Sequence, residues 1–168
     1  MKKNKNIILF SAPYDFLDIK KKNNKNKYKI KFKIINNLSD LFFDNNIIGW
    51  IPNPGQKFIV DKKVLSYFPN LKVIVTPSTG NNHINLRDCG KNYIKVLSLL
   101  DNKKDLKKIT ASSEFTFLKI LNSLRNIERG YNEVKKGRWR ENENFMRGRQ
   151  LNGKKIGLIG MGRIGKKI

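Results

Sequence analysis

Short apolar runs recur along the first hundred residues and predict the strands of a sheet. Residues 7–10 are continuously apolar, as in a strand covered on both faces. Residues 27–34 alternate lysine with apolar side chains, as in a strand with one face on the core. Further apolar runs occupy residues 47–51, 71–75 and 94–97. Because lysine on an outer face discourages pairing with another strand, we expect residues 27–34 at an edge of the sheet.

Helical segments separate these predicted strands. Asp61 can cap a short helix that reaches Tyr67 and that Pro69 prevents from continuing. Strands that alternate with helical segments predict an open, mostly parallel α/β sheet.

The spacing of apolar side chains changes after Ser112 to intervals of three and four residues. The side chains that follow this spacing are Phe117, Leu118, Leu121, Leu124, Ile127, Tyr131 and Val134. Such spacing predicts one long amphipathic helix, about residues 112–136, which ends near Gly137. The polar stretch from Arg138 to Arg149 carries no pattern that predicts structure.

The large positive net charge of the chain is weak evidence for a nucleic-acid partner. A net charge of +23 would favour a nucleic acid or another anionic partner. However, the 28 Lys, 22 Asn and 20 Ile residues all have codons rich in A and T, and aromatic residues do not alternate with the basic runs. We therefore interpret the lysines as a solvated surface without a nucleic-acid partner. The alternative is a basic α/β module that contacts nucleic acid, whose affinity would fall steeply with salt.

Cysteine content and the N-terminus predict a cytoplasmic protein with no membrane partner. Cys89 is the one cysteine, so no intramolecular disulfide can form, and we expect it to act as a small buried hydrophobe. The apolar run at residues 7–10 is shorter than the ~7–15 residues of a signal peptide or the ~20 of a membrane span.

A glycine motif near the end of the sequence carries the candidate chemistry. Gly160, Gly162 and Gly165 follow a predicted strand, residues 156–159, at the G-x-G-x-x-G spacing. The first glycine permits a tight turn, the second leaves room for a pyrophosphate, and the third allows close packing of helix on strand. The predicted dinucleotide site consists of Gly160, Met161, Gly162, Arg163, Ile164 and Gly165. The acidic residue that contacts the ribose is expected ~20 residues further on, so the choice between NAD and NADP stays open.

Three segments together resemble the D-isomer-specific 2-hydroxyacid dehydrogenase family. Residues 151–165, with Trp139 upstream, resemble the start of its nicotinamide domain. Residues 69–74 and 78–86 resemble its fourth strand and substrate loop, and residues 111–116 with Arg125 resemble its crossover helix. The resemblance implies a flavodoxin-like substrate domain, residues 1–104, followed by the beginning of a Rossmann NAD-binding domain, residues 105–168. The latter would comprise the crossover helix and a strand and glycine turn at residues 155–165.

The resemblance also implies hydride transfer between NAD(H) and the C2 atom of a 2-hydroxy or 2-keto acid, in a homodimer. Ser78, Thr79 and Gly80 would bind the substrate, since a loop after a parallel strand is a usual ligand site and its N–H groups can hold a carboxylate. The family's catalytic arginine, acidic residue and histidine are expected beyond Ile168. We therefore expect these 168 residues to be the N-terminal part of such an enzyme and to be inactive alone.

Three further polar residues have structural interpretations. We expect His83 to cap a helix or lie at the surface rather than act as an acid or base. Asn85 stands where the family usually has Asp, and either residue can cap a helix. We expect Glu114 to serve the N-terminal turn of the long helix.

Overall fold

The computed structural model describes residues 6–13 and 28–168, and the chain divides into two compact units, Met1–Leu106 and Lys107–Ile168. The described part of the first unit contains one five-stranded sheet. Its strands are β1 (Ile7–Phe10), β2 (Lys29–Phe32), β3 (Ile47–Ile51), β4 (Val73–Val75) and β5 (Lys95–Leu97).

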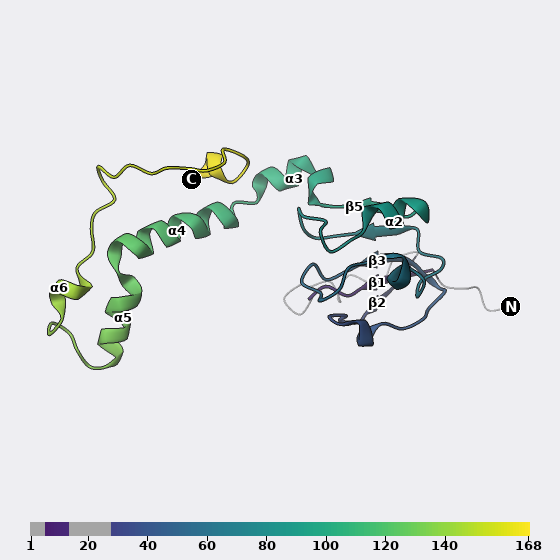
Figure 1. Cartoon of the computed structure of the whole chain (residues 1–168), viewed down its shortest axis with the longest axis horizontal. Coiled ribbons are helices and arrows are strands. Elements are labelled where there is room, and N and C mark those ends of the chain that lie inside the picture. The colour runs from purple at the N-terminus through teal and green to yellow at the C-terminus, as the bar shows by residue number, and fades with distance from the viewer. Residues whose placement is uncertain (1–5, 14–27) are drawn as a thin grey trace. The chain divides into compact units, whose positions relative to one another are not determined.

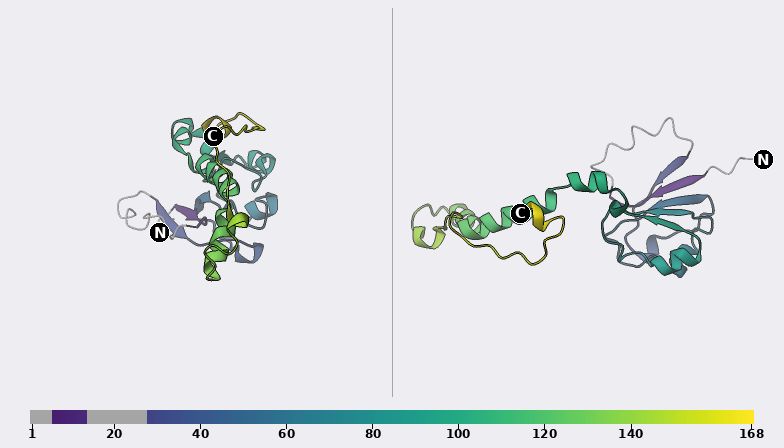
Figure 2. Two further views of the ribbon diagram at one scale, coloured as in Figure 1. Left: turned by 90° about the vertical axis from the view of Figure 1, so that its left-hand side faces the viewer. Right: turned by 90° about the horizontal axis from the view of Figure 1, so that it is seen from above.

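All neighbouring strands of this sheet are parallel, in the order β2-β1-β3-β4-β5 (Figures 1 and 2). This is the strand order of flavodoxin-like folds, in which the order reverses beside the first strand. The predicted parallel α/β sheet is confirmed, and the lysine-rich strand β2 lies at an edge as expected.

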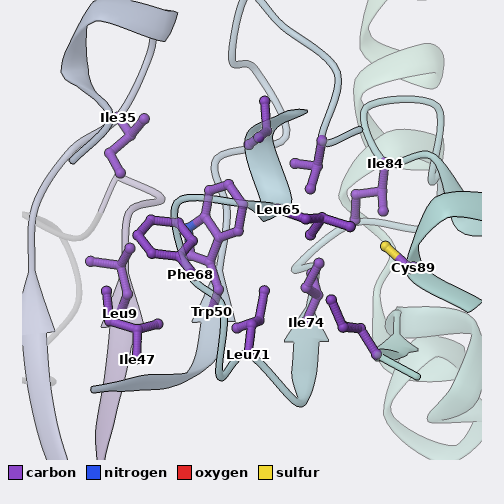
Figure 3. Packing of buried hydrophobic residues seen from close by; sticks show 13 residues of the cluster. Leu9, Ile35, Ile47, Trp50, Leu65, Phe68, Leu71, Ile74, Ile84 and Cys89 are labelled. Carbon is purple, nitrogen blue, oxygen red and sulfur yellow. The ribbon is translucent and has the colours of Figure 1, made fainter. Parts of the chain in front are cut away.

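One hydrophobic cluster fixes the sheet against the helices α1 (Lys62–Leu65) and α2 (Leu86–Lys91) (Figure 3). Trp50 of β3 is fully buried and packs edge-on against Phe68, with ring centroids 5.2 Å apart. Its indole N–H donates to Ser11 Oγ over 2.7 Å, so the one polar atom of the ring is satisfied inside the core. Cys89 of α2 belongs to the same cluster, as the sequence predicts.

Side-chain caps define where both helices begin. The Asp61 carboxylate accepts the Val64 N–H over 3.0 Å at the start of α1, and Asn85 accepts the Asp88 N–H over 3.2 Å at the start of α2. Both predicted capping roles are confirmed. Two 3₁₀ turns, η2 (Leu38–Asp40) and η3 (Leu99–Asp101), also lie in this unit.

The predicted single helix over residues 112–136 is wrong. Two helices, α4 (Ala111–Arg125) and α5 (Ile127–Lys135), meet at a bend at Asn126 (Figure 1). Asn126 has φ +51°, a left-handed conformation that asparagine tolerates, and its side-chain N–H donates to Arg147 O over 2.8 Å. The apolar spacing continues across the bend, so the pattern alone does not reveal it.

The polar segment after α5 contains a short helix. This helix, α6 (Glu143–Met146), lies within residues 138–149, where no element was predicted. A further helix, α3 (Lys103–Lys108), precedes α4. The predicted end near Gly137 is confirmed: Gly137 has φ +77°, and the Arg138 N–H donates to Glu133 O over 3.0 Å. The Glu133 carboxylate accepts from Asn142, Lys136 and Arg138, and these contacts hold its pKa below the ordinary value.

The strand predicted at residues 156–159 is also absent. The segment is irregular, and Ile156, Leu158 and Ile159 are exposed to solvent. A parallel strand depends on hydrogen bonds from neighbouring strands, and residues 107–168 supply none. The final regular element is a 3₁₀ turn, η4 (Gly165–Lys167).

Candidate functional site

The loop that follows β4 contains the predicted substrate residues. Its first residue, Thr76, is buried, and its N–H donates to Leu97 O over 2.8 Å, which extends the pairing of β4 with β5. Ser78 is half-buried, whereas Thr79 and Gly80 are exposed. Within the described part of the chain, the main-chain N–H groups of Ser78, Thr79 and Gly80 donate to no protein acceptor. These N–H groups are therefore available to a carboxylate at the carboxyl end of a parallel strand.

A hydrogen-bonded chain of side chains holds this loop. Thr76 Oγ1 lies 2.9 Å from His83 Nε2 and 2.8 Å from Ser78 Oγ, and Ser78 Oγ donates to Gly80 O over 2.8 Å. The interpretation of His83 as a cap or surface residue is wrong, because it is only 7% exposed. Burial lowers the pKa of its imidazole and favours the neutral ring. His83 thus holds the loop in place through its contact with Thr76.

A cavity of about 710 Å³ lies beside this loop, at the carboxyl edge of the sheet. The last residues of four strands line it: Phe10 of β1, Ile51 of β3, Val75 of β4 and Leu97 of β5. Such a volume lies within the ~300–1,000 Å³ of typical small-molecule sites. This cavity was not predicted from the sequence, although the apolar residue at the end of each predicted strand is the signal that points to it.

The loops after β4 and β5 supply the rest of the lining, which includes Pro77, Leu99, Thr76, Ser98, Asp101 and Asn102. The carboxylate of Asp101 accepts the N–H of Ser98 over 2.7 Å and lies in the first turn of η3. The Leu99 N–H donates to Ser78 O over 3.1 Å, so the wall of the cavity and the predicted substrate loop are directly connected.

The glycine motif forms a turn in which two glycines are sterically required. Gly160 has φ +97°, a conformation that side chains rarely adopt. A β-carbon on Gly165 would lie 2.3 Å from Gly160 O. In contrast, a β-carbon on Gly162 would meet no protein atom within 4 Å. The turn thus leaves open space at the second glycine, where a pyrophosphate would approach the backbone in the predicted site.

The other members of the motif attach the turn to its own unit. Arg163 donates to Ile109 O over 2.9 Å, so its guanidinium holds the turn near the start of α4 (Figures 1 and 2). Ile164 precedes η4, and Met161 is exposed. The helix expected after Gly165 is present only as this 3₁₀ turn.

The two candidate sites belong to different units of the chain. Ser78, Thr79 and Gly80 lie in Met1–Leu106, and the motif at residues 160–165 lies in Lys107–Ile168. Among the described residues, no group of three or more His, Cys, Asp or Glu side chains could hold a metal ion. In the same part of the chain, no helix combines the length and apolar character needed to cross a membrane.

A family model and curated relatives match this chain. Residues 117–168 match the family model of the D-isomer specific 2-hydroxyacid dehydrogenase NAD binding domain. A glyoxylate reductase of Thermofilum pendens is 38% identical over 108 residues, which cover 63% of this chain and 30% of that protein. The chloroplastic/mitochondrial formate dehydrogenase of Arabidopsis thaliana is 34% identical over 118 residues, 70% of this chain and 29% of that protein.

Solved structures of longer proteins share the fold. A glyoxylate reductase from Paecilomyes thermophila has a TM-score of 0.74 at 15% identity, covering 97% of this chain and 51% of its own. D-Lactate dehydrogenase from Aquifex aeolicus, complexed with NAD and lactic acid, has a TM-score of 0.68 at 25% identity, covering 96% and 46%. The chain spans about 30% of the length of the curated relatives it matches and about half of these structures. In the family match, in these relatives and in the shared fold, the chain is similar to the D-isomer specific 2-hydroxyacid dehydrogenase family.

Proposed function

We propose that this chain serves an NAD-dependent oxidoreductase that interconverts a 2-keto acid and a 2-hydroxy acid. In the reductive direction, hydride adds to C2 of the keto acid and its carbonyl oxygen takes a proton. Residues 1–104 form the substrate domain, and residues 105–168 begin the NAD-binding domain. The enzyme is cytoplasmic and acts as a homodimer, and it uses NAD, with NADP as the alternative coenzyme.

The observation that carries this proposal is the turn at residues 160–165. Its conformation requires glycine at Gly160 and Gly165 for reasons internal to the protein, whereas a β-carbon on Gly162 would meet nothing within 4 Å. Gly162 is the second glycine of the G-x-G-x-x-G spacing, the position at which a side chain would block a pyrophosphate. The bound coenzyme supplies the hydride, and the main-chain N–H groups of this turn would hold its pyrophosphate.

At the substrate, the carboxylate is bound by the N–H groups of Ser78, Thr79 and Gly80, which donate to no acceptor among the described residues. His83 is the single histidine of the chain, yet it is buried and hydrogen-bonded to Thr76. It therefore orients the loop and does not donate the proton. For this reason the 168-residue polypeptide, assayed alone, is expected to leave NADH unoxidised by any 2-keto acid.

The substitution Gly162→Val tests the coenzyme site. In the protein encoded by the complete reading frame, it should abolish NADH binding, measured by calorimetry, because the new side chain occupies the pyrophosphate position. The matched control is Gly157→Val, since a β-carbon there also meets no protein atom within 4 Å. Equal NADH affinity in the two variants would refute the assignment of the turn.

A further inference from the structure

The described residues that line the cavity at the carboxyl edge of the sheet differ in charge from the chain as a whole. Lys and Arg together number 36 in this sequence, yet no Lys or Arg is among the described lining residues. The charged residue among them is Asp101, an acid. The remaining lining is mainly apolar, including Phe10, Ile51 and Leu97.

We propose that this cavity receives the side chain of the 2-keto acid and selects a bulky apolar one, branched aliphatic or aromatic. The inference rests on the proposed function and names the substrate class of that same site. A substrate whose side chain carries a phosphate or a second carboxylate is rejected. The smallest keto acid, glyoxylate, has only a hydrogen at this position and gains nothing from the cavity.

The position of the cavity relative to the loop supports this assignment. Thr76 and Pro77 line the cavity and immediately precede Ser78, Thr79 and Gly80. The Leu99 N–H donates to Ser78 O over 3.1 Å, which joins the far wall to the same loop. A 2-keto acid whose carboxylate is held by the loop therefore has the cavity within reach of its side chain.

The charge distribution decides which side chains fit. A phosphate needs cations or several N–H donors to replace the water it loses, and here it would meet apolar carbon and the Asp101 carboxylate. An isobutyl or benzyl group instead replaces water against Phe10, Ile51, Val75 and Leu97, which favours its binding. Differences of this kind in a hydrophobic pocket amount to roughly 10–200-fold per methylene-sized change.

Steady-state kinetics of the protein encoded by the complete reading frame test the selection. With NADH as coenzyme, kcat/KM for 4-methyl-2-oxopentanoate and phenylpyruvate should exceed that for glyoxylate and for 3-phosphohydroxypyruvate by at least about tenfold. Preference for glyoxylate or the phosphorylated acid would overturn the inference and leave the proposed function standing. No oxidation of NADH with any of the four would refute the proposed function itself.

Ligand binding to the 168-residue chain tests the same selectivity without enzymatic turnover. In nuclear magnetic resonance titrations, 4-methyl-2-oxopentanoate should shift the methyl signals of Val75 and Leu97, and 3-phosphohydroxypyruvate should not. Shifts confined to Ser78, Thr79 and Gly80 with both acids would show a carboxylate site without selection among side chains. This result would refute the proposed preference for an apolar side chain.

A lysine placed in the cavity should weaken the preference for an apolar side chain. Val75→Lys introduces a cation at the end of β4, where the side chain is 39% exposed, and should lower the ratio of kcat/KM for 4-methyl-2-oxopentanoate over 3-phosphohydroxypyruvate at least about tenfold. Phe43→Lys is the matched control, because Phe43 is 68% exposed, precedes the amino end of β3 and does not line the cavity. An unchanged ratio in a folded Val75→Lys protein would contradict the proposal.

Discussion

His83 is a buried base whose neutral form suits the fold. It is 7% exposed, its Nε2 lies 2.9 Å from Thr76 Oγ1, and burial lowers its pKa from 6.5. The unfolded chain therefore binds a proton more readily than the folded chain, so acidification favours unfolding. We expect the free energy of unfolding to be at its full value above about pH 6.5 and to fall as the pH drops toward the lowered pKa of the folded state.

Urea denaturation at a series of pH values measures this dependence, and His83→Gln is the control that should flatten it between about pH 6.5 and 5. The carboxylates of Asp40 and Glu133 also have lowered pKa values, but they lose charge below about pH 4 and leave this window to His83. The same slope in the variant as in the parent chain would mean that another group titrates.

Tyr93 follows α2 in a conformation that glycine adopts more easily. Its φ is +55° and its side chain is 95% exposed, so the ring contributes little packing. The N–H groups of Tyr93 and Ile94 donate to Gly90 O and Cys89 O, the pattern of a left-handed helix end. Tyr93→Gly should stabilise the sheet unit by about 0.5–1 kcal/mol, since a left-handed residue costs about 1–2 kcal/mol and the greater freedom of glycine in the unfolded chain offsets part of that.

The fluorescence of the buried Trp50 reports this unfolding, because Trp139 is already 72% exposed. Tyr93→Ala retains a β-carbon and should bring no comparable gain. A Tyr93→Gly protein less stable than Tyr93→Ala would show that the tyrosine ring makes a stabilising contact.

At the scale of elements, the bend between α4 and α5 depends on a glycine elsewhere in the sequence. A β-carbon on Gly148 would lie 2.5 Å from Arg125 Cα, and the adjacent Arg149 N–H donates to Leu124 O over 2.6 Å. Gly148→Ala should therefore displace the segment and destabilise the second unit by about 1–3 kcal/mol. Hydrogen exchange should show the Arg149 amide losing its protection.

A glycine in the neighbouring helix provides the matched control. Gly130 lies within α5, and a β-carbon there meets nothing within 4 Å. Gly130→Ala should stabilise the same unit by about 0.5–1 kcal/mol through helix propensity. Alanine at the two positions should thus act in opposite directions, and destabilisation by both would indicate a general intolerance of substitution in this unit.

The sequence predicts well those elements that depend on local interactions or on one repeated pattern of apolar residues. The sheet strands and the caps Asp61 and Asn85 are examples, because period-two or continuous apolar runs and N-cap chemistry are visible in the sequence. The bend at Asn126 is not visible, since the contacts of this residue include a hydrogen bond to Arg147 O, 21 residues away. The strand at residues 156–159 fails for the related reason that its partners would have to come from elsewhere.

The candidate sites, too, can be predicted only in part from the sequence. Ser78 and Gly162 can be singled out from motifs in the sequence, whereas the contact of His83 with Thr76 and the cavity between four strand ends require the folded chain. Which side chains come together in a site depends on tertiary contacts, and the spacing of apolar residues along the sequence does not specify these contacts. The cavity nevertheless follows from the strand order, which places four apolar strand ends at one edge.

At the scale of the whole molecule, the two units differ in how much of the chain is buried. The first contains a buried cluster of side chains around the sheet, whereas no residue between 149 and 168 is buried. Local stability follows buried apolar contacts and protected backbone hydrogen bonds, so the second unit should open more often.

Limited trypsin digestion of the 168-residue chain should therefore cut after Lys154 and Lys155 before it cuts after Lys72 and Lys95. Lys72 and Lys95 are internal controls, because they too are exposed but their main-chain N–H groups donate to Ile48 O and Lys72 O in the sheet. Mass spectrometry of early time points should show cleavage at the first pair well before the second. Simultaneous cleavage at all four lysines would mean that the sheet unit opens as readily as residues 149–168, and that its hydrophobic cluster does not confer the independent stability argued here.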